Sequence, residues 1–452
     1  MNDPDASQPE PRKPMTTWAA VSLGLGAMIG AGIFALLGEA GTIAGSAVYL
    51  SFLLAGGIAL LSGYSLGKLG ARYPSAGGIV EYLVQCYGTG PFAGAMSIVL
   101  YVAAVVSVAL IAATFGNYAA ALLPGVPWRH ANDAFAIGIV LLFVAINLRG
   151  AREVAFWEQL TVTIKVAVLI VLAAVGLYTL QPELLAPRTY PPGQQVWFSL
   201  AITFFAYEGF RVITNTAEDM RDPARTLPRA MMIAILLVMV LYVAVSFAVF
   251  GNLPAERVAA AKDYALAEAA LPVFGRTGFR VIALAALVST ASTINANLYA
   301  VTNVTYQLAR DGELPAAFGR PIGHSREGLV ISGTIVSVLA LAFDLSQIAA
   351  IGSISILFVH GVVHLGHLRR THDTGASRPM VVLAMLATFG AMSVALVYLV
   401  ATSSRVVAIV LAGFLAGSFA LEIALRRWAG RGLRPRVPMT TGRGSSRGAP
   451  EP

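Results

Sequence analysis

Residues Gly24 to Phe34 read GLGAMIGAGIF and place four glycines in the middle of an apolar run. Each glycine costs a helix interior about 0.5–1 kcal/mol relative to alanine. A break in a membrane helix also leaves backbone groups unpaired, which lipid does not tolerate unless protein or a ligand covers them. Because the exposed end of a half-helix attracts anions, we expect this stretch to interrupt a membrane helix and to bind a carboxylate.

The composition indicates a membrane protein. Of the 452 residues, 57% are hydrophobic and 12% are charged, whereas soluble domains carry about 25% charged residues. A segment of about 20 apolar residues is long enough to cross a bilayer, and the sequence contains twelve such segments. They are 17–37, 44–67, 92–123, 134–148, 155–180, 196–216, 229–251, 277–309, 328–343, 346–368, 379–402 and 405–428. We therefore predict an all-α integral membrane fold with twelve transmembrane helices in one bundle.

The distribution of lysine and arginine predicts the orientation. If the N-terminus is cytoplasmic, 22 of the 31 basic residues fall in cytoplasmic segments and 7 in outer ones, as the positive-inside rule requires. We therefore expect a multi-pass protein of the cell membrane with both termini in the cytoplasm. The net charge of +8 then reflects orientation and affinity for anionic membrane lipid, so it does not indicate a nucleic acid partner. The single cysteine, Cys86, excludes an internal disulfide.

A second interruption is expected five spans later, where Phe204 to Phe210 read FFAYEGF. Interrupted helices at corresponding positions of two halves are typical of inverted-repeat transporters, which bind their substrate between the two breaks. The repeats would cover about 15–180 and about 196–370, and two further helices would cover about 379–428. Residues 1–14 and 429–452 are rich in proline, glycine and charge and are predicted to be disordered tails.

Five motifs occur in an order that resembles the amino acid, polyamine and organocation (APC) transporters. They are GLGAMIGAGIF at 24–34, YPSAGGIVEY at 73–82, NLRGAR at 147–152, YEGFRVITNTAEDMRDPARTLPRA at 207–230 and ARDGELP at 309–315. The resemblance extends from about residue 17 to 430 and is closest to proton-coupled bacterial and archaeal amino acid permeases. It implies a LeuT-type five-plus-five inverted repeat, alternating access and an amino acid-like substrate.

The same resemblance implies the substrate-binding residues. They are Met28, Ile29, Gly30, Ala31 and Gly32 in the first span and Phe205, Ala206, Tyr207 and Glu208 in the sixth. Family members often have a hydroxyl residue where Ala31 stands, so recognition on this side would depend on backbone amides. Tyr101 and Ser107 are candidates for the pocket wall. Alternatively, the glycines of the first span only allow helices to pack closely.

Lys165 lies eleven residues into the fifth span, about 16 Å along the helix at 1.5 Å per residue. The resemblance implies that its ammonium takes the place that sodium occupies in sodium-coupled relatives and exchanges a proton during transport. We expect it to bind carbonyl groups near Gly26 and the hydroxyls of Ser289 and Ser292, which lie three residues apart on one helix face. The alternative is a lysine that pairs with an acid or reaches lipid headgroups.

Two further sets of ionisable residues lie inside spans. Glu208 is at mid-span, where an acid is a functional candidate, and it could be a substrate counter-ion, a proton site or a structural partner of Arg211. His360, His364 and His367 are spaced i, i+4, i+7 and share a helix face. No cysteine or acid of the sequence joins these histidines, so we interpret them as partners of headgroups or carbonyl groups rather than as a metal site.

Together these patterns predict a secondary active transporter of amino acids, proton-coupled and independent of sodium. An amino acid or polyamine exchanger and a non-transporting amino acid sensor of the same fold stay open as alternatives. The sequence contains neither a phosphate loop nor a nucleophile and base at one membrane depth, so we expect no enzyme activity, no metal and no cofactor.

Overall fold

The structure is a computed structural model that describes residues 14–123, 130–149, 154–311, 314–402 and 405–429. The predicted tails, residues 1–14 and 429–452, lie almost entirely outside the described residues.

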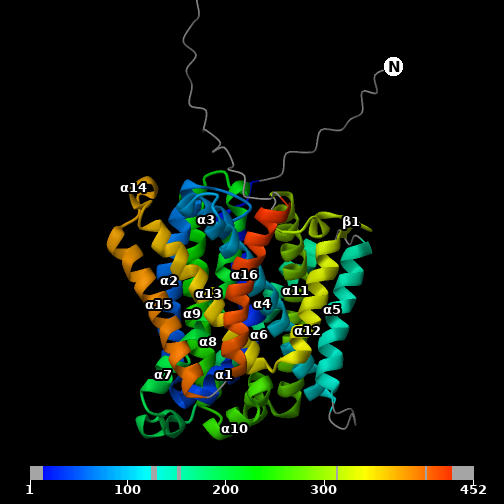
Figure 1. Cartoon of the computed structure of the whole chain (residues 1–452). Helices are drawn as coiled ribbons and strands as arrows, with labels where there is room; N and C mark the ends of the chain where they lie inside the picture. Colours follow the sequence, from blue (N-terminus) through cyan, green and yellow to red (C-terminus); the bar gives the residue numbers. More distant parts are fainter. Residues whose placement is uncertain (1–13, 124–129, 150–153, 312–313, 403–404, 430–452) are drawn as a thin grey trace, which may run out of the picture.

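Helices dominate the described part of the chain (Figure 1). The long α-helices are α1 (Thr17–Ala44), α2 (Val48–Arg72), α4 (Pro91–Leu122), α5 (Ala131–Arg149), α6 (Val154–Tyr178), α9 (Pro223–Phe250), α11 (Ala265–Asp311), α12 (Glu327–Ala342), α13 (Leu345–His367), α15 (Arg378–Ala401) and α16 (Arg405–Ala429). The short α-helices are α3 (Ile79–Tyr87), α7 (Gln194–Phe198), α8 (Leu200–Tyr207), α10 (Ala255–Ala260) and α14 (Thr371–Thr374). The 3₁₀ helices are η1 (Gly45–Ala47), η2 (Pro182–Leu185), η3 (Pro187–Thr189), η4 (Glu208–Asp219), η5 (Lys262–Tyr264) and η6 (Ala316–Gly319).

Within the described residues, nine helical segments are long and apolar enough to cross a membrane. Thr17–Gly30 and Glu327–Ala342 are shorter apolar helices. Large apolar side chains are exposed on the outside of the bundle, where they have no protein to pack against. Examples are Leu142, Val171, Val240, Val338 and Leu386, each more than half exposed. An apolar exterior around an all-helical core is consistent with a protein that spans the membrane several times.

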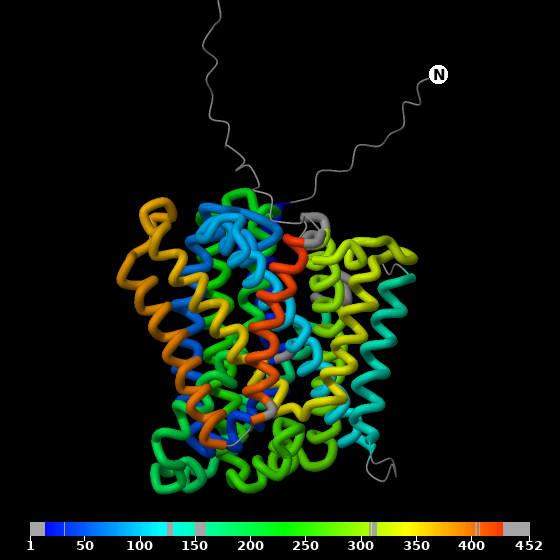
Figure 2. Tube along the Cα trace, in the orientation of Figure 1, coloured from blue at the N-terminus to red at the C-terminus, as the bar shows by residue number. Residues whose placement is uncertain are grey.

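The connections between helices gather at two opposite ends of the bundle (Figures 1 and 2). One end carries α3, α14 and the hairpin of strands β1 (Pro321–Ile322) and β2 (Ser325–Arg326) (Figure 1). Helix α16 also ends there, where Arg426 donates a hydrogen bond to the Thr89 carbonyl just before α4. We call this end the terminal face. The other end carries η2, α7 and α10, and we call it the opposite face.

Three local features go beyond the expected helices or refine them. Strands β1 (Pro321–Ile322) and β2 (Ser325–Arg326) form a two-residue hairpin that the all-α prediction did not include. The alanine-rich segment after α9 forms the short helix α10. Helix α11 bends at Gly275, whose φ of 64° is open to glycine, so two helices meet there.

Helix α1 is an unbroken α-helix from Thr17 to Ala44. The predicted interruption at Gly30 to Gly32 is therefore wrong. Glycine is used both where a helix breaks and where two helices approach closely, and the spacing of the glycines does not separate these cases.

The sixth apolar segment does change its helix type in mid-membrane. Helix α8 ends at Tyr207, and the backbone continues as the 3₁₀ helix η4 from Glu208. Because 3₁₀ geometry is tighter and its hydrogen bonds are poorer, long stretches of it often mark functional positions. Helix α1 packs against both α8 and η4, so the change of helix type lies beside the glycine-rich stretch.

Candidate functional site

A cavity lies between α1, α4, η4 and α11, beside the end of α8. Its inner wall is formed by Phe205, Ala206, Leu110 and Ile111. From there it extends to Gly77, in the loop before α3, and therefore toward the terminal face. The polar groups of its wall come from Tyr101, Ser107, Glu208, Arg211, Thr214, Asn215 and Asn297.

The structure brings some of the predicted binding residues to this cavity. Phe205, Ala206 and Glu208 line it, as do both candidate wall residues, Tyr101 and Ser107. The residues of the first span do not: α1 contributes Ala27 to the wall, whereas Met28, Ile29, Gly30 and Gly32 are absent from it. Tyr207 is absent too, and the side chain of Ala31 lies outside the described residues.

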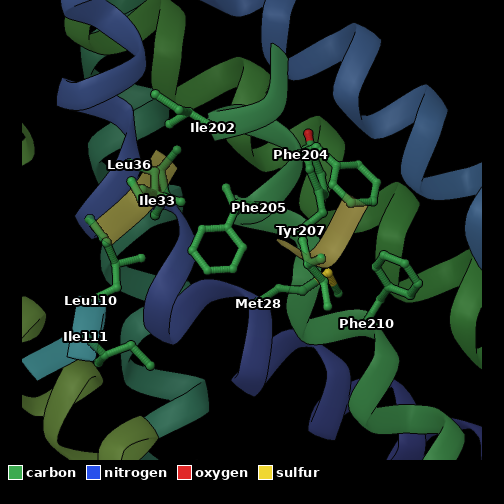
Figure 3. Close-up of a cluster of buried hydrophobic side chains, with 14 of the residues drawn as sticks. Met28, Ile33, Leu36, Leu110, Ile111, Ile202, Phe204, Phe205, Tyr207 and Phe210 are labelled. Atoms are coloured by element: carbon green, nitrogen blue, oxygen red, sulfur yellow. The ribbon is translucent and has the colours of Figure 1, made fainter. Parts of the chain in front are cut away.

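The two sides of α8 explain why Phe205 lines the cavity and Phe204 does not (Figure 3). The ring of Phe205 points toward α4, where Leu110 and Ile111 lie, while Phe204 and Phe210 are on the other side of the helix. Phe204 and Phe210 instead hold the ring of His360 between them at centroid distances of 5.8 and 5.6 Å.

The glycines permit backbone contact between α1 and the end of α8. A Cβ at Gly32 would lie 2.3 Å from the Ala206 carbonyl oxygen, and one at Gly209 would lie 2.3 Å from the Met28 nitrogen. Gly30 faces α11, where a Cβ would overlap the side chain of Thr293. The close-packing alternative for the first span therefore applies, and it places the α1 backbone directly behind the cavity wall.

Tyr242 of α9 joins the same two elements, and the sequence analysis did not single it out. Its hydroxyl lies 2.8 Å from the Met28 carbonyl and 3.3 Å from the Ala206 carbonyl, so its one proton can bind either acceptor. The residue is fully buried. The available signal was a tyrosine in the middle of an otherwise apolar span.

Lys165 of α6 reaches α1 and is not part of the cavity lining. Its side chain is buried, and Nζ donates a hydrogen bond of 2.6 Å to the Gly26 carbonyl. This is the carbonyl contact that the sequence analysis expects. A role of this amine in coupling stays a prediction.

The hydroxyl partners expected for Lys165 are arranged differently. Ser292 lies 3.1 Å from the hydroxyl of Thr161, one turn before Lys165 on α6. The Ser289 hydroxyl is buried and has no hydrogen-bond partner among the described residues. The expected bond between Lys165 and Ser289 is therefore not made in this structure.

Glu208 begins η4 and is 5% exposed. Its Oε1 lies 2.5 Å from Nε of Arg211, so the pairing of these two residues that the sequence suggested is present. Its Oε2 lies 3.5 Å from Nε2 of His360 on α13. The acid thus lies between a cation on the cavity side and an imidazole on the side of α2 and α13.

The three histidines of α13 face α2 and are fully buried. They contact Ser62 and Ser65, so the expected pairing with headgroups or carbonyl groups is wrong. No group of residues in the described chain has the composition to hold a metal ion.

At the opposite face, an ion pair joins α1 to η5. Lys262 of η5 lies 3.2 Å from the Glu39 carboxylate of α1. Ser346, at the start of α13, accepts a hydrogen bond of 2.8 Å from Lys262 and donates one of 2.6 Å to Glu39. Glu39 is 2% exposed, so the pair joins α1, η5 and α13 below the surface.

A bundle of membrane-spanning helices with a polar cavity among its central helices has the architecture of a membrane transporter rather than an enzyme. The comparison with known proteins agrees with this class. The chain belongs to the amino acid permease family, whose sequence profile matches residues 15–421.

Several relatives cover most of the chain. An uncharacterized protein of Methanocaldococcus jannaschii is 36% identical and covers 92% of this chain and 96% of its own length. The inner membrane transport protein YbaT of Escherichia coli is 34% identical over 83% of this chain and 87% of its own length. The mitochondrial cationic amino acid transporter 3 of Arabidopsis thaliana is 29% identical over 79% of this chain and 62% of its own length.

Proposed function

We propose that this protein is a secondary active transporter that moves amino acids together with protons, without sodium, by alternating access. The observation that carries the proposal is the cavity at the junction of α8 and η4, with Glu208 in its wall and the Lys165 ammonium on the α1 carbonyl behind it. Membership of the amino acid permease family supports the substrate class.

The proposal includes the twelve-span, five-plus-five arrangement of the LeuT type. In this arrangement, α1 opens the first repeat and α8 with η4 opens the second, and α15 and α16 are the two additional helices. The backbone contact between α1 and α8 at Gly32 and Gly209 supports it, because the first helices of the two repeats meet at the substrate site in such folds.

The substrate would bind in the cavity with its ammonium near the backbone carbonyls at the end of α8 and near Glu208. The ring of Phe205 would separate it from the opposite face. Residues 28–32 would form the α1 side of the site. Because α1 lies directly behind Ala206 and Gly209, a small displacement of α1 along α8 would expose its backbone to the bound carboxylate.

Coupling to protons is assigned to Lys165. Its ammonium binds the Gly26 carbonyl. Without the ammonium, a bound cation would be needed at this position. A lysine can give up its proton and leave this carbonyl, so its protonation state would change the contact between α6 and α1. In this scheme, Ser289 and Ser292 would receive the ammonium in another state of the cycle.

The protein is placed in the cell membrane with both termini in the cytoplasm. Lysine and arginine concentrate at the terminal face, as the positive-inside rule requires. The cavity extends toward this face, and the ion pair of Glu39 and Lys262 joins α1 to η5 at the opposite face, so the structure would represent a state open to the cytoplasm.

The test uses purified protein in liposomes and a panel of labelled amino acids. Uptake is measured with a pH gradient imposed inside alkaline, with no gradient, and with a sodium gradient alone. We expect concentrative uptake of some amino acids with the pH gradient and none with sodium alone.

Each other outcome contradicts a defined part of the proposal. Binding without uptake would indicate a sensor. Uptake only against a preloaded amino acid would indicate an exchanger, and uptake driven by sodium alone would remove Lys165 from the coupling role.

A further inference from the structure

A chain of hydrogen-bonding side chains leads from Glu208 between α2 and α13. Nδ1 of His360 lies 2.9 Å from the Ser62 hydroxyl. Nε2 of His360 lies 3.5 Å from Oε2 of Glu208 without a hydrogen bond between them, so a small approach of the two groups is needed to complete the chain at this end. The Ser62 hydroxyl also lies 2.8 Å from Nε2 of His364. Ser62 therefore bridges two imidazoles that are one helical turn apart.

The pattern repeats on the next turn and ends at the terminal face. Nδ1 of His364 lies 2.9 Å from the Ser65 hydroxyl, which lies 2.8 Å from Nδ1 of His367. Nε2 of His367 then lies 2.8 Å from the hydroxyl of Thr374. Thr374 is half-buried and ends α14, at the terminal face (Figure 1).

We call Ser62, Ser65, His360, His364 and His367 the histidine–serine chain. All five residues are 0% exposed, so water does not reach its middle. The three histidines cover about 10 Å along α13 at 1.5 Å per residue. The chain thus connects a buried acid in the cavity wall with the surface of the terminal face.

The donors and acceptors of the chain can all point in one direction. A neutral imidazole has one donor and one acceptor nitrogen, and a serine hydroxyl donates one hydrogen bond while it accepts another. If Thr374 turns its hydroxyl proton from the carbonyls of Arg370 and Thr371 to His367, each following group donates to the next, and the Nε2 proton of His360 faces the Glu208 carboxylate. In the opposite direction every imidazole is in its other tautomer, His367 donates to Thr374, and a protonated Glu208 faces Nε2 of His360.

We propose that the histidine–serine chain conducts protons between Glu208 and the terminal face. A proton from water enters at Thr374, and each imidazole takes up a proton on one nitrogen and releases one from the other. Each hydroxyl likewise gains one proton and loses one, and the last proton moves from Nε2 of His360 to the Glu208 carboxylate. The net change is one proton less in water and one more on Glu208.

The groups around the chain do not provide a second route among the described residues. Arg211 flanks Glu208 on the cavity side, and Cys86 and Tyr87 of α3 pack against α13 near Gly366. Tyr87 donates to the Val362 carbonyl and is engaged there. Beyond α13, Arg370 pairs with Asp373 at the entrance.

This inference rests on the proposed proton coupling, and it adds Glu208 as a second proton site besides Lys165, with the route by which a proton reaches or leaves it. A purely structural role, in which the serines only hold α2 against α13, would need no uniform direction of donors. In that case, replacing the serines would lower the stability of the folded protein rather than the proton flux.

The experiment measures two activities of the same proteoliposomes. One is proton flux on addition of a transported amino acid, followed by a pH-sensitive dye inside the vesicles. The other is exchange of labelled for unlabelled amino acid at equal pH, which moves no net proton. The variants are Ser62→Ala and Ser65→Ala, with Ser62→Thr to restore a hydroxyl.

The control is Ser97→Ala on α4. Ser97 is as buried as the two serines of the chain but donates only to the Ala93 carbonyl of its own helix. The thermal stability of every variant is measured in detergent, so that a loss of folded protein is recognised.

We expect Ser62→Ala and Ser65→Ala to lower proton flux at least about tenfold while exchange stays within about twofold. Ser62→Thr and Ser97→Ala should behave as the wild type.

Wild-type flux in both alanine variants would overturn the proton pathway and leave the proposed function intact. Equal loss of flux and exchange would also overturn it and would assign the serines a structural role. Absence of proton flux in the wild type would instead overturn the proposed coupling.

Discussion

The contact between Lys165 and the Gly26 carbonyl lies at the centre of the proposed coupling. Lys165→Met keeps the length and apolar stem of the side chain but removes the ammonium. A hydrogen bond to a charged group contributes roughly 1.5–3 kcal/mol, so we expect uptake driven by a pH gradient to fall at least about tenfold. Uptake is measured in proteoliposomes with and without the gradient.

Lys165→Arg separates charge from proton exchange at the same position. Arginine keeps its positive charge at all accessible pH values, so this variant should bind substrate and still lose the response to the pH gradient. Strong pH-driven uptake by either variant would exclude Lys165 from the coupling role.

The glycines of α1 have a packing role that substitution can test. In Gly32→Ala, the new methyl group would lie 2.3 Å from both the Ala206 carbonyl and the Tyr242 hydroxyl. Overpacking of this kind costs about 1–3 kcal/mol, and it would separate α1 from α8 at the site. We expect lower thermal stability and loss of uptake. Gly57→Ala is the control, because no atom lies within 4 Å of its added methyl group, and wild-type behaviour of both variants would contradict the close contact.

Single residues differ in how far the sequence predicts their partners. Lys165 was expected at a carbonyl near Gly26, because the resemblance implied that its ammonium takes the place of a bound cation. The partners of the three histidines could not be predicted. Their spacing shows that they share a face, but which helix covers that face depends on tertiary packing, and the two serines of α2 are not unusual in a membrane span.

The elements α1 and η4 also show that sequence alone does not predict tertiary contacts. Both segments combine glycine with an apolar run, and both were predicted to be interrupted, but only the sixth segment changes its helix type. Glycine pattern alone indicates that a backbone is approached closely or bent. The contact of Gly32 with Ala206, on a helix far away in sequence, decides between these outcomes.

The start of η4 gives a prediction for Glu208. Glu208→Gln is nearly isosteric but removes the negative charge beside Arg211 and the proton acceptor beside His360. If the acid takes part in proton transfer, the variant should fold, and proton flux should fall at least about tenfold more than exchange, a change in barrier of about 1.4 kcal/mol. Exchange should fall less, through the lost charge near the substrate ammonium. The measurements are flux, exchange and thermal stability. A variant that fails to fold and is rescued by Arg211→Met would assign the acid a structural role instead.

Across the whole molecule, the sequence predicted the apolar segments well, because lipid requires long apolar helices with all backbone groups paired. Every predicted segment overlaps a helix in the structure. The β1–β2 hairpin and the contact of α1 with η5 at the opposite face were not predicted. They depend on short connecting segments and on pairs such as Glu39 and Lys262, which are 223 residues apart in the chain.

The cavity extends toward the terminal face, whereas the ion pair of Glu39 and Lys262 joins α1 to η5 at the opposite face, so this pair should bias the molecule toward the present state. Lys262→Met leaves Glu39 without its cation and weakens this contact. A loss of about 1.4 kcal/mol changes the ratio of two states about tenfold. We therefore expect the cavity to become accessible from the opposite face about ten times more often.

Accessibility can be measured with a cysteine introduced at Ser107, which lines the cavity, and a membrane-impermeant thiol reagent added from the side of the opposite face. The native Cys86 interferes little, because burial raises the pKa of its thiol to about 12 and keeps it in the unreactive form. Arg257→Met is the matched control, since Arg257 pairs with Glu268 at the same face but is largely exposed. Faster labelling is expected with Lys262→Met alone. Equal rates in the two variants would mean that Glu39 and Lys262 do not hold the opposite face closed, and closure would then depend on apolar packing around Phe205.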